Sequence, residues 1–209
     1  KHLLIVGILT LLMVLMLFYK YPQGVKVLEY RLRGHLVQKT QNYTLVYLEE
    51  DKADMPVVAW ASERAYKAVT HKLNYTPKRR IPVIIFPDGE SLQGAFGWPS
   101  DGNHQGVYHK GVIYIQSPRA LGLNEEGLQE EFYLKGPMVH ELTHLLVDDL
   151  SSGNHPRWFT EGLAQYLERE ITGYTLDMDF DIDKSCPYSQ KELFQSFDDL
   201  PDVPKAYLQ

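Results

Sequence analysis

The stretch that decides the fold is MVHELTHLLVDDL, residues 138–150. An apolar stripe at helical spacing runs through it, formed by Met138, Val139, Leu142, Leu145 and Leu146. His140 and His144 are four residues apart, so a helix places both on one face, about 6 Å apart along its axis. Two imidazoles in that position can bind one metal ion, and Glu141 beside them can take a proton from metal-bound water.

A third metal ligand is expected from the segment WFTEGLA, residues 158–164. Glu161 lies 17 residues after His144, on a second helix that follows the short loop SSGNHP. Two helices joined by such a loop pack against each other, which brings Glu161 over the two histidines. Gly162 and Ala164 are small and are expected to let the helices approach closely. Two histidines and one glutamate leave the fourth position of a tetrahedral zinc ion open for water.

Residues 3–18, LLIVGILTLLMVLMLF, form an almost unbroken apolar run. Its length is close to that of a membrane-spanning helix, no face of it is polar, and no small residues follow it as a signal-peptidase site would require. We therefore expect an uncleaved single-pass membrane anchor over residues 1–20 that contacts the lipid bilayer, rather than a cleaved signal peptide or a core helix.

The orientation of this anchor depends on the cations that flank it. Lys20, Lys26, Arg31 and Arg33 follow the run and only Lys1 precedes it, which alone would place the domain in the cytoplasm. The chain does not start with methionine, so preceding residues can reverse this count. We expect a protein of the cell membrane whose catalytic domain is extracytoplasmic.

The composition excludes other classes of protein. Apolar residues make up 44% of the 209 residues and charged residues 23%, as in a globular protein. The net charge of −6 argues against a nucleic-acid partner. One cysteine, Cys186, cannot form an internal disulfide.

The hydrophobic pattern predicts an α+β domain over residues 43–209, behind a juxtamembrane helix within residues 21–42. The order of the elements favours a mostly antiparallel sheet beside a helical layer. The expected elements are a helix over 25–41, a strand over 44–48, a helix over 55–73, a strand over 81–86, a loop-rich stretch over 88–111, a strand over 112–116, and helices over 135–149 and 156–170.

HELTH (140–144) followed by HPRWFTEGLAQYLE (155–168) resembles the gluzincin metallopeptidases, in particular their peptidase-MA-like domains. Upstream, IPVIIFPDGESLQGAFG (81–97) and GVYHKGVIYIQSP (106–118) are similar to the family's strand, loop and edge strand. The resemblance implies a zincin-like fold and one zinc ion per chain on His140, His144 and Glu161. It also implies a peptide or protein substrate, Glu141 as the base, and residues 112–116 as the edge strand that pairs with extended substrate.

The family's domains continue through further helices, so we expect this chain to be a shortened version of the domain. Some gluzincins carry a downstream tyrosine or histidine that stabilises the oxyanion, and by position Tyr207 is the candidate for this catalytic role. The expected activity is hydrolysis of peptide bonds by metal-activated water. The alternatives are another zinc hydrolase chemistry, a membrane-anchored binding module with a structural or relic zinc site, and a purely structural membrane protein.

Other polar residues are set aside. We interpret His104 and His109 as exposed loop histidines rather than ligands of a second metal, and His155 as a helix cap rather than a neighbour of the metal. The alternating aspartates over 177–183 lack the glycine and glutamate of a calcium loop, so they favour a strand with one acidic face.

Overall fold

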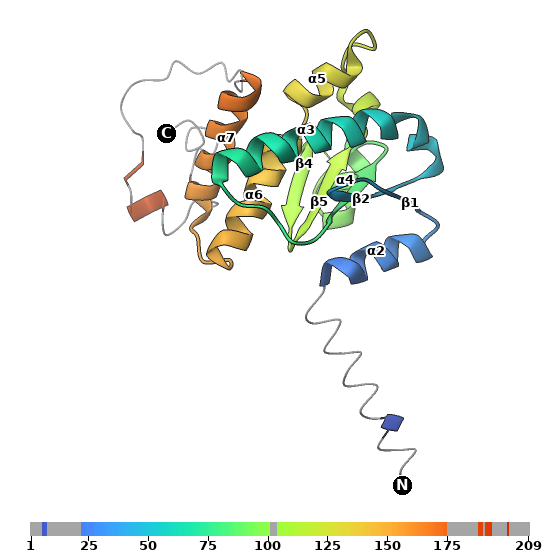
Figure 1. The fold of residues 1–209 in the computed structure, drawn as a ribbon, viewed down its shortest axis with the longest axis horizontal. Coiled ribbons are helices and arrows are strands. Elements are labelled where there is room, and N and C mark those ends of the chain that lie inside the picture. Colours follow the sequence, from blue (N-terminus) through green and yellow to red (C-terminus); the bar gives the residue numbers. More distant parts are fainter. Residues whose placement is uncertain are drawn as a thin grey trace.

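The helix that contains His140 and His144 packs on one face of a five-stranded sheet (Figure 1). The computed structural model describes residues 6–7, 22–100, 104–174, 188–189, 191–193 and 200. Over these residues the protein is α+β, as the sequence predicts, with helices against both faces of the sheet.

The sheet is mixed, and the expectation of a mostly antiparallel sheet is wrong. Its strands lie in the order β1-β2-β3-β5-β4. The two outer pairs, β1 with β2 and β4 with β5, are antiparallel, while the two inner pairs, β2 with β3 and β3 with β5, are parallel. The strands are β1 (Leu36–Lys39), β2 (Tyr43–Tyr47), β3 (Ile81–Phe86), β4 (Gly106–His109) and β5 (Val112–Gln116).

The parallel pairing follows from the long helix α3 (Met55–Leu73), which lies between β2 and β3 in the chain. A helix of this length carries the chain back across the sheet, so the next strand runs in the same direction as the last. Asp54 and Pro56 lie at its start, and Asn74 ends it in a left-handed conformation (φ 48°). The sequence predicts the bounds of α3, β3 and β5 correctly, and β3 is the central strand as expected.

The expected edge strand, residues 112–116, lies inside the sheet, because β4 covers its outer side. Lys110 and Gly111, both with positive φ (47° and 79°), form the two-residue turn that joins the two strands. Positive φ at both positions is the geometry of a tight hairpin. The stretch expected as loop therefore contains β4 and also a short helix, α4 (Gly89–Phe96), whose start Asp88 caps through the Ser91 amide.

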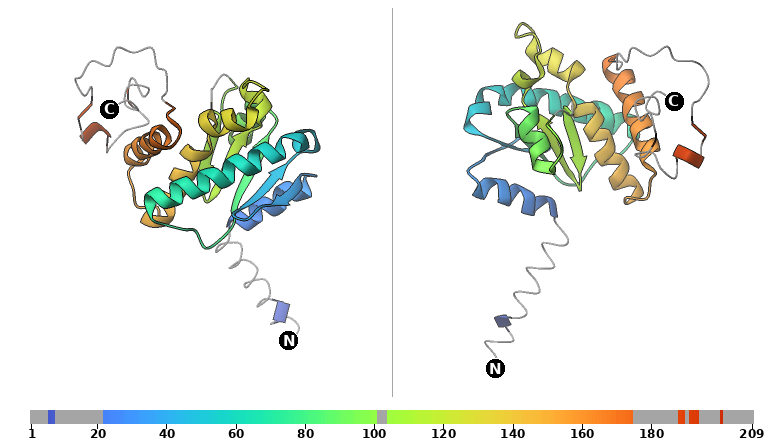
Figure 2. Two further views of the ribbon diagram at one scale, coloured as in Figure 1. Left: turned by 45° about the horizontal axis from the view of Figure 1, so that its top comes forward. Right: turned by 180° about the vertical axis from the view of Figure 1, so that it is seen from behind.

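Both faces of the central strands are buried. On one face Val83, Ile85, Ile113 and Ile115 join the larger core, which α3 and the helices that follow β5 complete. The other face is formed by Ile84, Phe86, Val112 and Tyr114. These residues pack with Leu92 of α4 and with Tyr30 of helix α2 (Pro22–Leu32). Figure 2, right, shows α4 in front of the sheet on this second face. The fold thus has two layers of helix around one sheet.

The remaining helices are α2 (Pro22–Leu32), α5 (Leu128–Lys135), α6 (Met138–Ser151) and α7 (Arg157–Thr172). The single helix expected over residues 25–41 is wrong in its second half. Gly34, in a left-handed conformation (φ 93°), follows the end of α2, and β1 then pairs with β2. Two 3-10 helices, Glu49–Asp54 and Pro118–Leu121, complete the described elements.

Several expectations fall on residues outside the described ranges. These are the anchor over residues 1–20 apart from residues 6–7, the acidic segment 177–183, Cys186 and Tyr207. Within the described residues, no helix has both the length and the apolar character needed to cross a membrane.

Candidate metal site

Helices α6 and α7 hold the candidate site, and their connection explains how they come together. The chain leaves α6 through Ser152 and Gly153, both in left-handed conformations (φ 54° and 76°), and Pro156 then precedes α7. This short turn sends α7 back along α6, and the two helices lie side by side (Figure 1). Ala164 is fully buried, but a Cβ atom at Gly162 would meet nothing within 4 Å, so the helices do not need that glycine to approach.

His140, His144 and Glu161 converge on one point between the two helices. The Oε2 atom of Glu161 lies 3.5 Å from Nε2 of His140 and 3.4 Å from Nε2 of His144. One ligand atom from each residue can be chosen so that all three lie within 4.8 Å of one another. This group could hold one metal ion, as the sequence predicts.

The other ring nitrogen of each histidine has a partner of its own. His140 Nδ1 lies 3.3 Å from Oε2 of Glu168, and His144 Nδ1 lies 2.8 Å from the hydroxyl of Thr160. With Nδ1 of each ring protonated and donating to these oxygens, each Nε2 keeps its lone pair for a metal. The arrangement orients both rings toward Glu161 and is compatible with the tautomer that a metal ligand requires.

The close packing of these groups shifts the pKa values of His140 and Glu161. Burial lowers the pKa of His140, but its hydrogen bonds with Glu161 and Glu168 outweigh burial and raise the pKa to about 10. Burial raises the pKa of Glu161, and the hydrogen bonds with the two histidines outweigh it, so the pKa of Glu161 is lowered well below its usual range. The cluster thus pairs the anionic Glu161 carboxylate with a protonated His140 imidazole, whose place a cation can take.

Glu141 lies beside this cluster, buried between α6 and the edge strand. Burial raises the pKa of Glu141, whereas the two imidazoles and a hydrogen bond from the backbone N–H of Tyr108 lower it. A Cβ atom at Gly106 would lie 2.9 Å from Cγ of Glu141 and 2.6 Å from Cβ of Pro137. Strand β4 therefore needs glycine at this position to pack against Glu141.

An arginine side chain lies at the outer side of the site. Arg157, one turn before Glu161 on α7, lies with its Nε 3.4 Å from Oε1 of Glu161. The two oxygens of Glu161 thus have different neighbours: Oε2 faces the histidines, and Oε1 faces the guanidinium. This favours a carboxylate that binds a metal through one oxygen.

Three other histidines that the sequence analysis considered lie away from the metal site. His155 is not the N-cap of α7, because that position belongs to Pro156; its Nε2 lies 3.6 Å from Oδ1 of Asp148. His104 and His109 are exposed, as expected, and contact the aromatic rings of Trp98 and Phe96. Among the described residues neither belongs to a group that could hold a metal.

Sequence reasoning missed Thr160, Glu168 and the contacts of β4 with Glu141. Thr160 and Glu168 could have been found from their positions in the sequence. Thr160 is adjacent to Glu161, and Glu168 follows Glu161 by seven residues, two turns along the same face of α7. The position of β4 had no such signal, because its four residues lie in a glycine-rich stretch.

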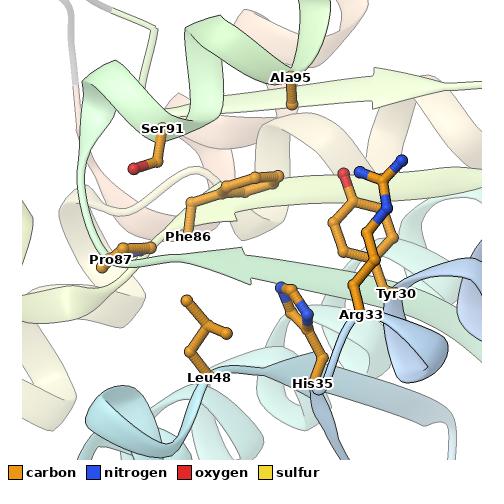
Figure 3. A pocket seen from close by; sticks show the side chains of 8 residues that line it. All are labelled: Tyr30, Arg33, His35, Leu48, Phe86, Pro87, Ser91 and Ala95. Carbon is orange, nitrogen blue, oxygen red and sulfur yellow. The ribbon is translucent and has the colours of Figure 1, made fainter.

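A pocket of about 300 Å³ lies on the opposite face of the sheet, where α2 and α4 approach the ends of β2 and β3 (Figure 3). Its lining includes Tyr30, Arg33, His35, Phe86 and Ser91. It contains none of the metal-site residues. The guanidinium of Arg33 is paired with Glu29 at 2.8 Å and is mostly exposed. We therefore take the α6–α7 cluster as the functional site.

Comparison of the chain with family models, curated proteins and solved structures finds no match. The assignment of a function therefore rests on the fold and on the geometry of the α6–α7 cluster.

Proposed function

We propose that the chain is a zinc-dependent peptidase. The observation that carries the proposal is the spacing of the ligand atoms. Ligands about 2.0–2.1 Å from a tetrahedral zinc ion are about 3.3 Å from one another. Glu161 Oε2 lies 3.5 Å and 3.4 Å from the two Nε2 atoms, so its distance to each histidine is close to that between two ligands of one zinc ion. Two imidazoles and one carboxylate are a known ligand set for catalytic zinc.

The number of ligands favours a catalytic over a structural zinc ion. A structural site has four protein ligands, whereas a catalytic site keeps one position open for water. Within the described part of the chain, three residues converge. Glu168 faces Nδ1 of His140, away from the shared point, so it supports a ligand rather than acting as a fourth one.

Glu141 is the proposed base. A bound zinc ion would polarise the scissile carbonyl and make a water molecule at its open position acidic, with a pKa of about 7. Glu141 would accept a proton from this water as it attacks the carbonyl carbon, and would pass the proton to the leaving nitrogen. Burial raises the pKa of the Glu141 carboxyl, which makes it a stronger base toward this water. Burial also keeps bulk water away from the carboxylate.

A peptide is the proposed substrate because an edge strand lies against the base. In the β4–β5 hairpin, His109 and Val112 close the two-residue turn and form a hydrogen-bonded pair. The backbone groups of alternate residues, Gly106 and Tyr108, then point away from β5, toward the outer edge. The Tyr108 N–H is directed at Glu141, so an extended peptide can pair with the backbone groups of Gly106 and with the carbonyl of Tyr108 on this edge. The resemblance to the peptidase-MA-like domains supports the same substrate.

The proposed setting is a single-pass protein of the cell membrane with an extracytoplasmic catalytic domain. The support is the apolar run over residues 3–18, whose length is close to that of a membrane-spanning helix. Recovery of the full chain in the membrane fraction after a carbonate wash would agree with this setting. Recovery in the supernatant would contradict it.

Glu141→Gln tests the proposed reaction. The amide cannot take a proton from water, so we expect hydrolysis of a peptide mixture to fall by about 10²–10⁴-fold while one zinc ion per chain is retained. Glu170→Gln, the same change at an exposed position of α7, is the matched control and should leave the rate unchanged. Hydrolysis by Glu141→Gln at the wild-type rate would remove Glu141 from the mechanism.

A further inference from the structure

Tyr108 joins the edge strand β4 to helix α6 at two points. Its backbone N–H faces the carboxylate of Glu141 and lowers the pKa of that carboxyl, and Gly106, two residues earlier on β4, packs against the Glu141 side chain. Its phenol donates a short hydrogen bond to Oδ2 of Asp148, and the same phenol oxygen accepts from the backbone N–H of Gly111, at 3.1 Å. One residue therefore contacts the proposed base with its main chain and a second carboxylate of the same helix with its side chain.

The two carboxylates lie on one side of α6. Asp148 follows Glu141 by seven residues, about two helical turns, and follows His144 by four. The stretch of α6 between the two contacts therefore includes His144. A strand fixed at both contacts cannot slide along α6 or move away from it without breaking one of them.

The turn of the β4–β5 hairpin is hydrogen-bonded to the same phenol oxygen. The Gly111 amide, which bonds the phenol, belongs to the Lys110–Gly111 turn. The phenol oxygen thus connects three segments: strand β4, the turn that follows it, and helix α6. Because burial and the neighbouring Asp148 carboxylate raise the pKa of Tyr108 well above its usual range, the phenol remains a donor throughout the physiological pH range.

We propose that Tyr108 is a positioning residue whose bond to Asp148 fixes β4 at the place where the Tyr108 amide holds the Glu141 carboxylate. The inference rests on the proposed function for its effect on the reaction. Without the phenol, β4 is free to move from α6, the amide no longer constrains Glu141, and the carboxylate samples orientations that do not reach the water. The metal ligands on α6 and α7 keep their own partners, so zinc binding does not depend on this bond.

The test compares Tyr108→Phe with Asp148→Asn and Asp148→Ala. Tyr108→Phe and Asp148→Ala both break the bond. In each we expect one zinc ion per chain, KM within about twofold of the wild type, and kcat about tenfold lower. The amide oxygen of Asp148→Asn still accepts from the phenol, so this variant should keep a kcat close to the wild-type value. The double variant Tyr108→Phe with Asp148→Ala should be no slower than either single variant, because both remove the same bond.

Tyr114→Phe is the matched control, because Tyr114 is a buried tyrosine on the neighbouring strand that faces α4 rather than α6. It should leave kcat and KM unchanged. A Tyr108→Phe variant with wild-type kcat would overturn the proposal. Loss of zinc in that variant, or equal losses of kcat in Asp148→Asn and Asp148→Ala, would also overturn it, because each would indicate general damage to the fold.

Amide hydrogen exchange at residue 108 gives a readout that does not need activity. We expect the amide to exchange about tenfold faster in Tyr108→Phe and in Asp148→Ala than in the wild type and in Asp148→Asn. Unchanged exchange in all variants would refute the positioning role. Should the zinc-loaded wild-type chain hydrolyse no peptide, the proposed function fails, while the exchange rates still decide whether Tyr108 holds the strand.

Discussion

The two faces of the sheet present contrasting polar environments. Between α6 and α7, two imidazoles and a carboxylate point to one place, and Thr160 and Glu168 hold the far side of each ring. Between α2 and α4 lies a pocket of about 300 Å³, but its arginine, in the turn that follows α2, is paired with Glu29 of that helix. The comparison shows that the converging groups of the molecule, which could hold a metal ion, lie away from this pocket.

The side chains that contact the second nitrogen of each metal-binding histidine give the strongest test of the difference between the two faces. Glu168→Ala removes the carboxylate on Nδ1 of His140, and loss of such a partner weakens metal binding by about 10–100-fold. Glu170→Ala, two residues further along α7, removes an exposed carboxylate and serves as the control. Competition with a zinc-binding dye measures both affinities. Equal affinities in the two variants would mean that Glu168 does not orient His140.

Two glycine substitutions compare the two faces directly. At Gly106, next to Glu141, an added methyl would overlap Pro137 and Glu141, and overpacking of this kind costs about 1–3 kcal/mol. At Gly94 on α4, it would meet nothing within 4 Å, and alanine in a helix stabilises by about 0.5–1 kcal/mol over glycine. Denaturant unfolding should show opposite signs for Gly106→Ala and Gly94→Ala. A stabilising Gly106→Ala would contradict the close packing of β4 on Glu141.

A smaller effect is expected in the pH dependence of the metal-free protein. The pKa of His140 is raised to about 10 in the folded state, against a usual value of 6.5. Its contribution to stability is therefore complete below about pH 6.5 and is lost as the pH rises through about 10. We expect the free energy of unfolding of zinc-stripped protein to fall over this range, and to fall less in His140→Gln. The same decline in both proteins would show that His140 is not its source.

Much of this account could be predicted from the sequence. Local pattern was sufficient for α3, β3 and β5, because a long amphipathic stripe and runs of β-branched residues determine an element without reference to its neighbours. The spacing of His140, His144 and Glu161 was also sufficient, since helical geometry and one short loop bring them together.

Other features depend on contacts between distant segments. Residues 36–39 continue a helical apolar spacing from α2, yet they form β1, because pairing with β2 outweighs local preference. The position of β4 outside β5 depends on a two-residue turn within a glycine-rich stretch, and the role of Gly106 depends on its contact with Glu141. The parallel pairing of β2 with β3 could have been predicted, because a 19-residue helix between two strands already favours a parallel pair.

The most direct test of the account is the zinc content of three purified proteins, measured by elemental analysis after dialysis: the wild type, His144→Ala and His35→Ala. His144 lies in the α6–α7 cluster and His35 in the pocket on the other face. We predict one zinc ion per chain in the wild type and in His35→Ala, and none in His144→Ala. A wild-type protein without zinc, or a His144→Ala protein that retains a full equivalent, would contradict the assignment of the metal site.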